Sequence, residues 1–132
     1  MPSRASAGGR VARGLILFGH GSREPRWAEP FERLAAEVRS QTSCEVRLAY
    51  LEVMQPDLEG AAESLIASGA TSIRIVPIFF GQGGHITRDL ASWLDRLRER
   101  HPGVAFESTA AIGDDAAVIE ALAAYCLRSL SA

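Results

Sequence analysis

Residues 14–22 read GLILFGHGS, an uncharged apolar run that gives way to two glycines around a histidine. A short run that is apolar without interruption predicts a strand buried on both faces, here over residues 14–18. The following residues are polar, and a helical pattern then covers residues 28–40. Its apolar side chains recur every three or four positions and are predicted to face the core: Phe31, Leu34, Ala35 and Val38. Pro30 falls in the predicted first turn, where its missing N–H costs little.

The same strand–loop–helix unit is repeated along the chain. Further strands are predicted over residues 46–51, 72–79 and 104–107, and further helices over 56–69, 86–100 and 114–130, the last with Asp114 as its N-cap. Strands that alternate with helices predict an α/β fold, with one parallel sheet and helices on both faces. Right-handed crossovers favour a flavodoxin-like single lobe of four strands in the order 2-1-3-4.

Pro77 fits poorly inside a central strand, because proline has no N–H to donate to a neighbouring strand. Either pairing ends at Val76, or a bulge turns the chain toward the glycine-rich loop of residues 80–85. Broken local rules often lie beside functional sites. The misplaced proline therefore indicates that the carboxyl end of this strand lies near a functional site.

Length and composition describe one globular domain. The chain has 132 residues, of which 47% are hydrophobic and 23% charged, the usual mix of a soluble protein. The net charge of -2 argues against nucleic-acid binding. No apolar run approaches the roughly 20 residues that a membrane span requires. We expect residues 1–13 to be a disordered lead-in and 14–132 to form the domain, in the cytoplasm.

Two residue types in the sequence constrain its chemistry further. All fourteen basic residues are arginine, so any anion site is built from guanidinium groups, which grip carboxylates in a fork geometry. The two cysteines, Cys44 and Cys126, lie far apart and in no metal-binding spacing, and we interpret both as small core residues. Trp27 and Trp93 lie on predicted helices and are interpreted as packing residues.

Three reactive side chains fall just past the ends of predicted strands. His20 follows the first strand, Glu52 closes the second, and His85 follows the third. The carboxyl ends of parallel strands share one edge, where ligands bind in open α/β sheets. Two imidazoles and a carboxylate suit a divalent first-row metal, and the same groups can transfer protons near neutral pH. His101, before Pro102 at a helix end, is interpreted instead as a C-terminal cap.

Other interpretations of the glycine-rich loops are less favoured. A dinucleotide site needs a third glycine that the loop after Gly19 and Gly21 lacks, and a phosphate nest is the remaining option there. A phosphohistidine enzyme would carry arginine immediately before the histidine, where this chain has Gly19. The glycines beside both histidines, including Gly83 and Gly84, would let a large flat ligand approach the backbone.

Taken together, these motifs resemble those of the short form of the CbiX/SirB sirohydrochlorin chelatases, a branch of the type II chelatases. The matching stretches are LILFGHGSREP at 15–25, LAYLEVMQPDL at 48–58 and VPIFFGQGGHITRDL at 76–90, in the family's order and spacing. The chain departs from the family at Ala111-Ile112-Gly113, where Pro-Leu-Gly is expected, and at Ala91, where proline is common. Neither departure affects the matched histidines.

The resemblance implies a function. Family members insert cobalt or iron into sirohydrochlorin without ATP, for cobalamin or siroheme synthesis, and their catalytic and metal-binding residues correspond to His20, His85 and Glu52. Short members are expected to be homodimers with no prosthetic group, whose substrates are the ring and Co²⁺, Fe²⁺ or Ni²⁺. Because the ring is rich in carboxylates, arginines near the rim are expected to bind it. The expected substrate-binding residues are Ser22, Arg23, Arg26, Gly83, Gly84 and Arg88. A carrier that uses the same site without turnover is the alternative.

Overall fold

The computed structural model describes residues 12–81 and 83–131, without the side chains of residues 84 and 85. Residues 1–11, most of the predicted lead-in, lie outside this description. The strands are β1 (Arg13–Gly19), β2 (Glu45–Tyr50), β3 (Ser72–Pro77) and β4 (Ala105–Ser108). The α-helices are α1 (Glu29–Arg39), α2 (Leu58–Ala67), α3 (Gly84–Arg100) and α4 (Ala116–Arg128), and the 3₁₀ turns are η1 (Pro25–Ala28), η2 (Ile112–Asp114) and η3 (Ser129–Ser131).

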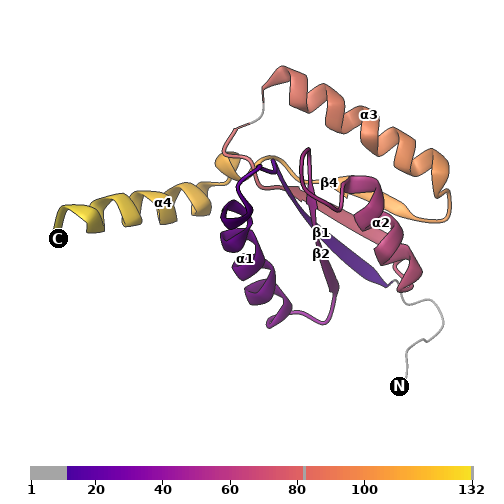
Figure 1. The fold of residues 1–132 in the computed structure, drawn as a ribbon, viewed down its shortest axis with the longest axis horizontal. Helices are drawn as coiled ribbons and strands as arrows, with labels where there is room; N and C mark the ends of the chain where they lie inside the picture. Colours follow the sequence, from indigo (N-terminus) through magenta and orange to yellow (C-terminus); the bar gives the residue numbers. More distant parts are fainter. Residues whose placement is uncertain (1–11, 82, 132) are drawn as a thin grey trace.

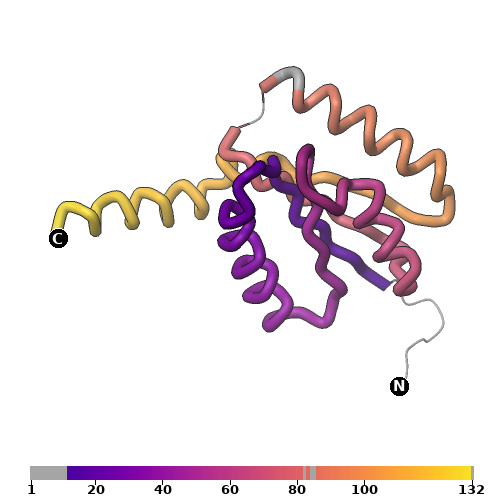
Figure 2. The backbone as a smooth tube through the Cα atoms, viewed as in Figure 1, coloured from indigo at the N-terminus to yellow at the C-terminus, as the bar shows by residue number. Residues whose placement is uncertain are grey.

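The four strands form one parallel sheet in the order β2-β1-β3-β4, as predicted. Helices α2 and α3 lie on one face and α1 on the other, whereas α4 projects away from the sheet (Figure 1). The backbone tube follows the same path and ends far from the body (Figure 2). Each predicted element is present, and its ends differ from the prediction by one to a few residues.

The two faces of β1 belong to different cores because successive side chains of a strand point to opposite faces. Ile16 and Phe18 pack with the α2 and α3 side chains, in a large cluster that includes Leu65 and Leu97. Leu17 packs on the α1 side, in a smaller cluster with Ala35 and Val46. The face beneath α1 is therefore the less completely covered one.

Pro77 is the last residue of β3 and pairs in register with Phe18, so pairing extends one residue further than Val76. In a parallel strand, successive N–H groups point alternately to the two neighbours. The β4 pairing already ends at Ile75, opposite Ser108. The next residue, Ile78, donates its N–H to the Phe18 carbonyl at 2.7 Å. The proline thus lies where no hydrogen bond to β4 is required.

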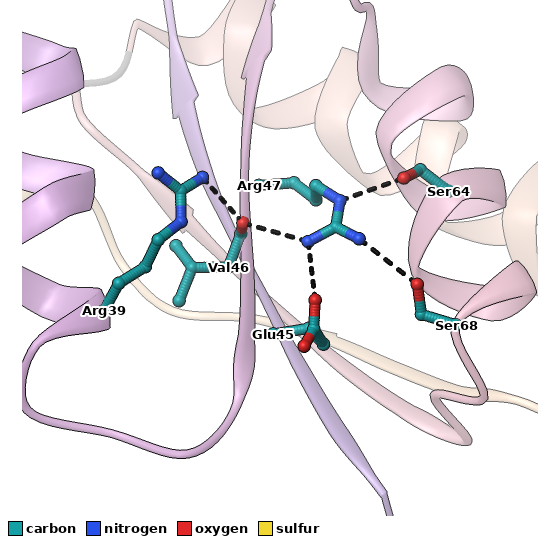
Figure 3. Close-up of polar contacts among 6 residues, drawn as sticks. All are labelled: Arg39, Glu45, Val46, Arg47, Ser64 and Ser68. Carbon is teal, nitrogen blue, oxygen red and sulfur yellow. Dashed lines mark hydrogen bonds and ion pairs between the residues drawn. The ribbon is translucent and has the colours of Figure 1, made fainter.

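Arginines fix the edge strand β2 at its start, far from its carboxyl end (Figure 3). The Val46 carbonyl accepts hydrogen bonds from Arg39 at 2.8 Å and from Arg47 at 3.2 Å. Arg47 also donates to the Ser64 and Ser68 hydroxyls of α2, at 2.9 and 3.2 Å. Part of the arginine content is therefore committed to the scaffold and is not available for anion binding.

Three predictions about side chains were wrong. The N-cap of the last helix is Asp115, whose carboxylate accepts from the Val118 N–H at 3.1 Å, whereas Asp114 belongs to η2. Leu34, predicted to face the core, is 38% exposed. Cys126 is exposed because α4 does not pack on the sheet, whereas Cys44 is half-buried. Neither cysteine forms a disulfide. The packing roles of the tryptophans are confirmed: Trp93 contacts Phe18, and Trp27 contacts Phe31.

Candidate metal-insertion site

His20 stands at the carboxyl edge of the sheet, immediately after β1, and is exposed. Its ring meets the buried Phe79 ring edge-on, with centroids 5.4 Å apart and planes at 74°. Phe79 in turn packs on Phe18 at 5.6 Å. The core therefore supports one side of the imidazole and leaves the rest open to a ligand.

Glu52 lies beside His20 because hydrogen bonding between the β1 and β2 segments continues past the strand ends. The Leu51 N–H donates to the Gly19 carbonyl at 2.9 Å, and the Glu52 N–H donates to the His20 carbonyl at 3.1 Å. The Glu52 side chain is exposed. The structure therefore brings this pair together, as the sequence predicted, at the level of the backbone.

Gly21 makes this close approach possible. Its φ is +94°, and a Cβ on this residue would lie 2.0 Å from the Glu52 carbonyl oxygen. The next turn is also unusual, since Val53 has a φ of 71° and the Gln55–Pro56 peptide is cis. The Tyr50 N–H donates to the Pro56 carbonyl at 2.9 Å and closes the turn.

His85 is the second residue of α3, which begins at the same edge of the sheet. Its side chain lies outside the described part of the structure, so the structure does not test its convergence with His20. Gly83 is the N-cap of α3, and its carbonyl accepts from the Thr87 N–H at 3.1 Å. The predicted substrate-binding glycines thus lie at a helix N-terminus, where free N–H groups favour anions.

The loop between β3 and α3 is held in place from the other side by η2. A Cβ on Gly113 would lie 1.5 Å from the Phe80 carbonyl oxygen. Only glycine allows this approach. The residues that depart from the family pattern, Ala111 and Ile112, therefore lie directly before the glycine that contacts this loop. Gly113 itself matches the family pattern.

The predicted docking arginines are available for a ligand. Arg23, Arg26 and Arg88 are exposed, and within the described residues their guanidinium groups have no hydrogen-bond or ion-pair partner. Ser22 is half-buried, and its hydroxyl accepts from the Glu24 N–H at 3.1 Å, which gives it a structural role in the loop.

A small hollow of about 180 Å³ lies beneath this edge, between α2 and α3. Its lining includes Phe18, Leu51, Trp93 and Arg96. Its volume is below the 300–1,000 Å³ typical of ligand pockets. A tetrapyrrole therefore does not fit into this hollow, and a ring would have to bind on the open edge above it.

A second group of acidic and histidine side chains joins α2 to α3. His101 is the C-cap of α3, as predicted, and its Nε2 lies 3.3 Å from a carboxylate oxygen of Glu59. Potential ligand atoms of Glu59, Glu63 and His101 lie within 4.8 Å of one another. Arg100 also contacts Glu59, at 3.6 Å. This cluster links the start of α2 to the C-terminal end of α3, and it contains none of the three predicted site residues.

Tyr50 is the one described group whose acidity is clearly shifted. Burial and, secondly, the negative charge of Glu32 raise the pKa of Tyr50 above its ordinary value of 10.0. The phenol lies at the end of β2, 6.3 Å from the Trp27 ring. It therefore stays neutral at physiological pH and adds no charge next to Glu52.

Comparison with known proteins agrees with the geometry. The sequence model of the CbiX family matches residues 14–128. The chain belongs to the CbiX family. The resemblance inferred from the GHGS, LEVMQPDL and GGHITRDL stretches is thereby confirmed, and so is the chelatase-like fold.

Relatives of the CbiX chain include enzymes with assigned reactions. A sirohydrochlorin cobaltochelatase of Saccharolobus solfataricus is 34% identical over 115 residues, 83% of this chain and 89% of that protein. A sirohydrochlorin ferrochelatase of Bacillus subtilis is 27% identical over 109 residues, 82% of this chain but 42% of that protein. A cobaltochelatase of Methanocaldococcus jannaschii is 34% identical, with 62% of its length covered.

Solved structures of CbiX and SirB proteins share the fold. A CbiX protein from Marinobacter aquaeolei VT8 superposes with a TM-score of 0.81 at 28% identity, covering 90% of this chain and 98% of that one. SirB from Bacillus subtilis with Fe³⁺ gives a TM-score of 0.72 at 26% identity and covers 84% of this chain. This CbiX chain spans 44% of that SirB chain.

Apolar residues at the edge of the CbiX chain escaped the sequence analysis. Phe79 supports the His20 ring, Phe80 is 67% exposed, and Val53 is 59% exposed. In the sequence these residues read as strand and turn positions of a buried core. No pattern in the sequence identified the exposure of Phe80 or Val53.

Proposed function

We propose that this chain is a sirohydrochlorin chelatase that inserts Co²⁺ or Fe²⁺ into the ring, in cobalamin or siroheme synthesis. The observation that carries the proposal is the hydrogen bond between the Glu52 N–H and the His20 carbonyl at the carboxyl edge of the sheet. This hydrogen bond brings a residue with a carboxylate and a residue with an imidazole together on neighbouring loops. The names of the CbiX relatives supply the substrate.

In the proposed mechanism, His20 and His85 hold the metal, and the ring approaches from the open side of the edge. Imidazole nitrogen suits cobalt, iron and nickel alike. A site with few protein ligands leaves the metal free to exchange its water for ring nitrogens. The edge-on contact with Phe79 supports one side of the His20 ring.

Insertion also requires that two ring N–H groups lose their protons. Glu52 or one of the histidines accepts these protons, since an exposed carboxylate and a neutral imidazole both act as bases near neutral pH. The exposed Phe80 and Val53 offer apolar contacts to the ring faces. These roles use only groups that stand at the edge of the sheet.

An absorbance assay tests the function. Purified protein is mixed with sirohydrochlorin and Co²⁺, Fe²⁺ or Ni²⁺ in turn, and the loss of the free-ring spectrum is followed. A chelatase is identified if the spectrum is lost faster than in the protein-free control and if each protein molecule converts more than one ring. Binding of ring and metal without turnover would identify the alternative, a carrier.

The Glu52→Gln variant is expected to insert metal about 10- to 100-fold more slowly, because the amide keeps the shape of the side chain and cannot accept a proton. The measurement is the initial rate of insertion against pH. The control is Glu99→Gln, which removes an exposed carboxylate on α3. If Glu52→Gln matches the wild type at every pH, Glu52 has no role as a base.

Reversing a charge at the rim is expected to weaken substrate binding. Arg23 lies three residues from His20 in the same loop, and Arg23→Glu should raise the apparent KM by roughly 10-fold with little change in kcat. A remote carboxylate is held equally in the ground and transition states, which is uniform binding. The effect should shrink as salt increases, because exposed charge pairs are screened beyond about 8 Å at physiological ionic strength.

The control for Arg23 is Arg33→Glu, an exposed residue of α1. Kinetics of both variants at low and high salt separate local docking from a change in net charge. Equal effects of the two substitutions, or a KM for Arg23→Glu that equals that of the wild type, would leave ring binding to apolar and glycine contacts.

The proposal includes a homodimer in the cytoplasm. A macrocycle about 15 Å across needs two walls to exclude water, as ligand pockets bury most of their ligand. One lobe of 14.2 kDa offers a single open edge. The two free cysteines accord with a reducing compartment. Among the described residues, no helix is long and apolar enough to span a membrane.

A further inference from the structure

Two helices on the same face of the sheet bring three potential metal ligands together. Helices α2 and α3 both cover this face (Figure 1). Glu59 and Glu63 belong to α2, and His101 is the C-cap of α3. One ligand atom of each residue lies within 4.8 Å of the other two. The proposed insertion mechanism uses none of these side chains, so their arrangement requires a separate explanation.

The two carboxylates of this cluster lie on one side of α2. Glu59 and Glu63 are four residues apart, and side chains at this spacing are neighbours on a helix surface, where like charges repel each other. Arg100 offsets part of the repulsion, since its guanidinium lies 3.6 Å from a Glu59 oxygen. Among the described residues, Glu63 has no hydrogen-bond or ion-pair partner. Two carboxylates and one guanidinium leave the cluster with an excess of negative charge.

The His101 imidazole is held in place by its own backbone and by the core. The His101 N–H donates to the Leu97 carbonyl at 2.9 Å, and the His101 carbonyl accepts from the Val104 N–H at 3.0 Å. The imidazole lies 6.2 Å from the buried Phe106 ring, measured between centroids. A side chain that is already ordered loses little entropy when it binds a ligand. These contacts therefore preorganise the imidazole next to Glu59.

The contact between His101 and Glu59 has the spacing of two ligands on one cation. The His101 Nε2 lies 3.3 Å from the Glu59 carboxylate oxygen, which is longer than the ~2.7–3.2 Å of most N–H···O hydrogen bonds. With metal–ligand bonds of about 2.0–2.1 Å, neighbouring ligand atoms of a tetrahedral zinc site are roughly 3.3–3.4 Å apart. A cation can therefore bind both atoms with little movement of either side chain, and the exposed Glu63 can rotate to supply a third ligand.

Space for water ligands lies beside Glu59. The hollow of about 180 Å³ between α2 and α3 has two acidic residues, Asp57 and Glu59, and one basic residue, Arg96, in its lining. One water molecule takes up about 30 Å³ in the liquid. The hollow thus has room for the water that completes a coordination sphere with three protein ligands. Such a site remains open to exchange, unlike a structural site with four protein ligands.

We propose that Glu59, Glu63 and His101 form a divalent-cation site that is separate from the insertion site. The cation is a first-row metal such as Co²⁺ or Zn²⁺, because a mixed set of imidazole nitrogen and carboxylate oxygen suits these ions, whereas Mg²⁺ and Ca²⁺ prefer oxygen ligands alone. The bound ion displaces the exposed Arg100 side chain, since an exposed ion pair contributes little to stability. It connects α2 to the end of α3.

Equilibrium dialysis with Co²⁺ alone tests this site in a chain that lacks both insertion histidines. The His20→Ala/His85→Ala chain is expected to bind one Co²⁺ per chain. Adding Glu63→Gln should weaken this binding by at least about 10-fold, because even groups that only orient a metal ligand change the affinity by about that factor. Adding Glu29→Gln, which removes an exposed carboxylate of α1, is the control and should leave the binding unchanged.

Two results of the dialysis would overturn the proposal. One is the absence of bound Co²⁺ in the His20→Ala/His85→Ala chain. The other is Co²⁺ binding that neither Glu63→Gln nor His101→Ala weakens, which would be adventitious binding elsewhere. Glu63 is exposed, so Glu63→Gln is expected to fold even if the loss of the α3 cap destabilises His101→Ala. The outcome does not depend on chelatase activity, because the test requires no ring and no turnover.

Thermal melts and one further variant provide an independent measure. In the same His20→Ala/His85→Ala chain, saturating Co²⁺ should raise the melting temperature by at least about 3 °C, since a ligand that binds only the folded state stabilises it. Adding Arg100→Gln should tighten Co²⁺ binding roughly 2- to 5-fold, because it removes the cation that competes for Glu59. A melting temperature that Co²⁺ does not raise, or weaker binding after Arg100→Gln, would contradict the proposal.

Discussion

The His20→Ala variant is expected to lose metal-insertion activity by at least about 100-fold, with a melting temperature close to that of the wild type. His20 is exposed and contributes one edge-on contact with Phe79 to the packing of the fold. Loss of an exposed loop side chain usually changes stability by little. Loss of the imidazole removes a nitrogen ligand that no other described side chain at this edge supplies.

The other two histidines of the chain give a matched series. His85→Ala should lose activity to the same extent as His20→Ala, because both rings bind the same metal in the proposed mechanism. His101→Ala should keep most of the activity, since His101 caps α3 and contacts Glu59, which is not one of the proposed insertion residues. Initial rates and thermal melts of all three variants, measured side by side, make the comparison. A folded His20→Ala protein with wild-type activity would remove His20 from the mechanism.

The sheet could be predicted from the sequence because short apolar runs, each within one segment of the chain, identify its strands. The apolar run at 14–18 is short, continuous and bounded by glycine, so it has few alternatives to a buried strand. The repeated spacing of strand and helix, with right-handed crossovers, then restricts the topology and favours the order β2-β1-β3-β4 that the structure shows. For the same reason His20 and Glu52 could be assigned to one edge before any contact between them was known.

What the sequence could not predict depends on contacts between distant segments. The apolar periodicity of α4 indicates a helix, but not whether that helix packs on its own sheet, and the expectation that Cys126 is a core residue failed for this reason. Likewise, Asp114 and Asp115 both suit an N-cap, and the choice depends on where η2 ends. The close approach of Gly113 to the Phe80 carbonyl joins segments more than 30 residues apart, and no local pattern encodes it.

The Gly21→Ala variant is expected to lose both stability and metal insertion. The residue has a φ of +94°, and a Cβ would lie 2.0 Å from the Glu52 carbonyl oxygen. The left-handed backbone alone costs about 1–2 kcal/mol for alanine, and the backbone contact must also open. Because the Glu52 N–H is bonded to the His20 carbonyl, the displacement separates the two proposed site residues. We expect at least a 10-fold loss of rate, which thermal melts and the insertion assay would measure.

Two other glycines separate the causes of this effect. Gly69 also has a positive φ, +101°, but nothing lies within 4 Å of its Cβ position, so Gly69→Ala should destabilise the fold by about 1 kcal/mol and leave the rate unchanged. Gly103 has neither the strained φ nor a close neighbour, and Gly103→Ala should be within about 0.5 kcal/mol of the wild type. If Gly21→Ala instead behaves like Gly69→Ala, with full activity and only modest destabilisation, the Glu52 carbonyl can move without any loss of metal insertion. The spacing between the β1 and β2 loops would then not be what aligns His20 with Glu52.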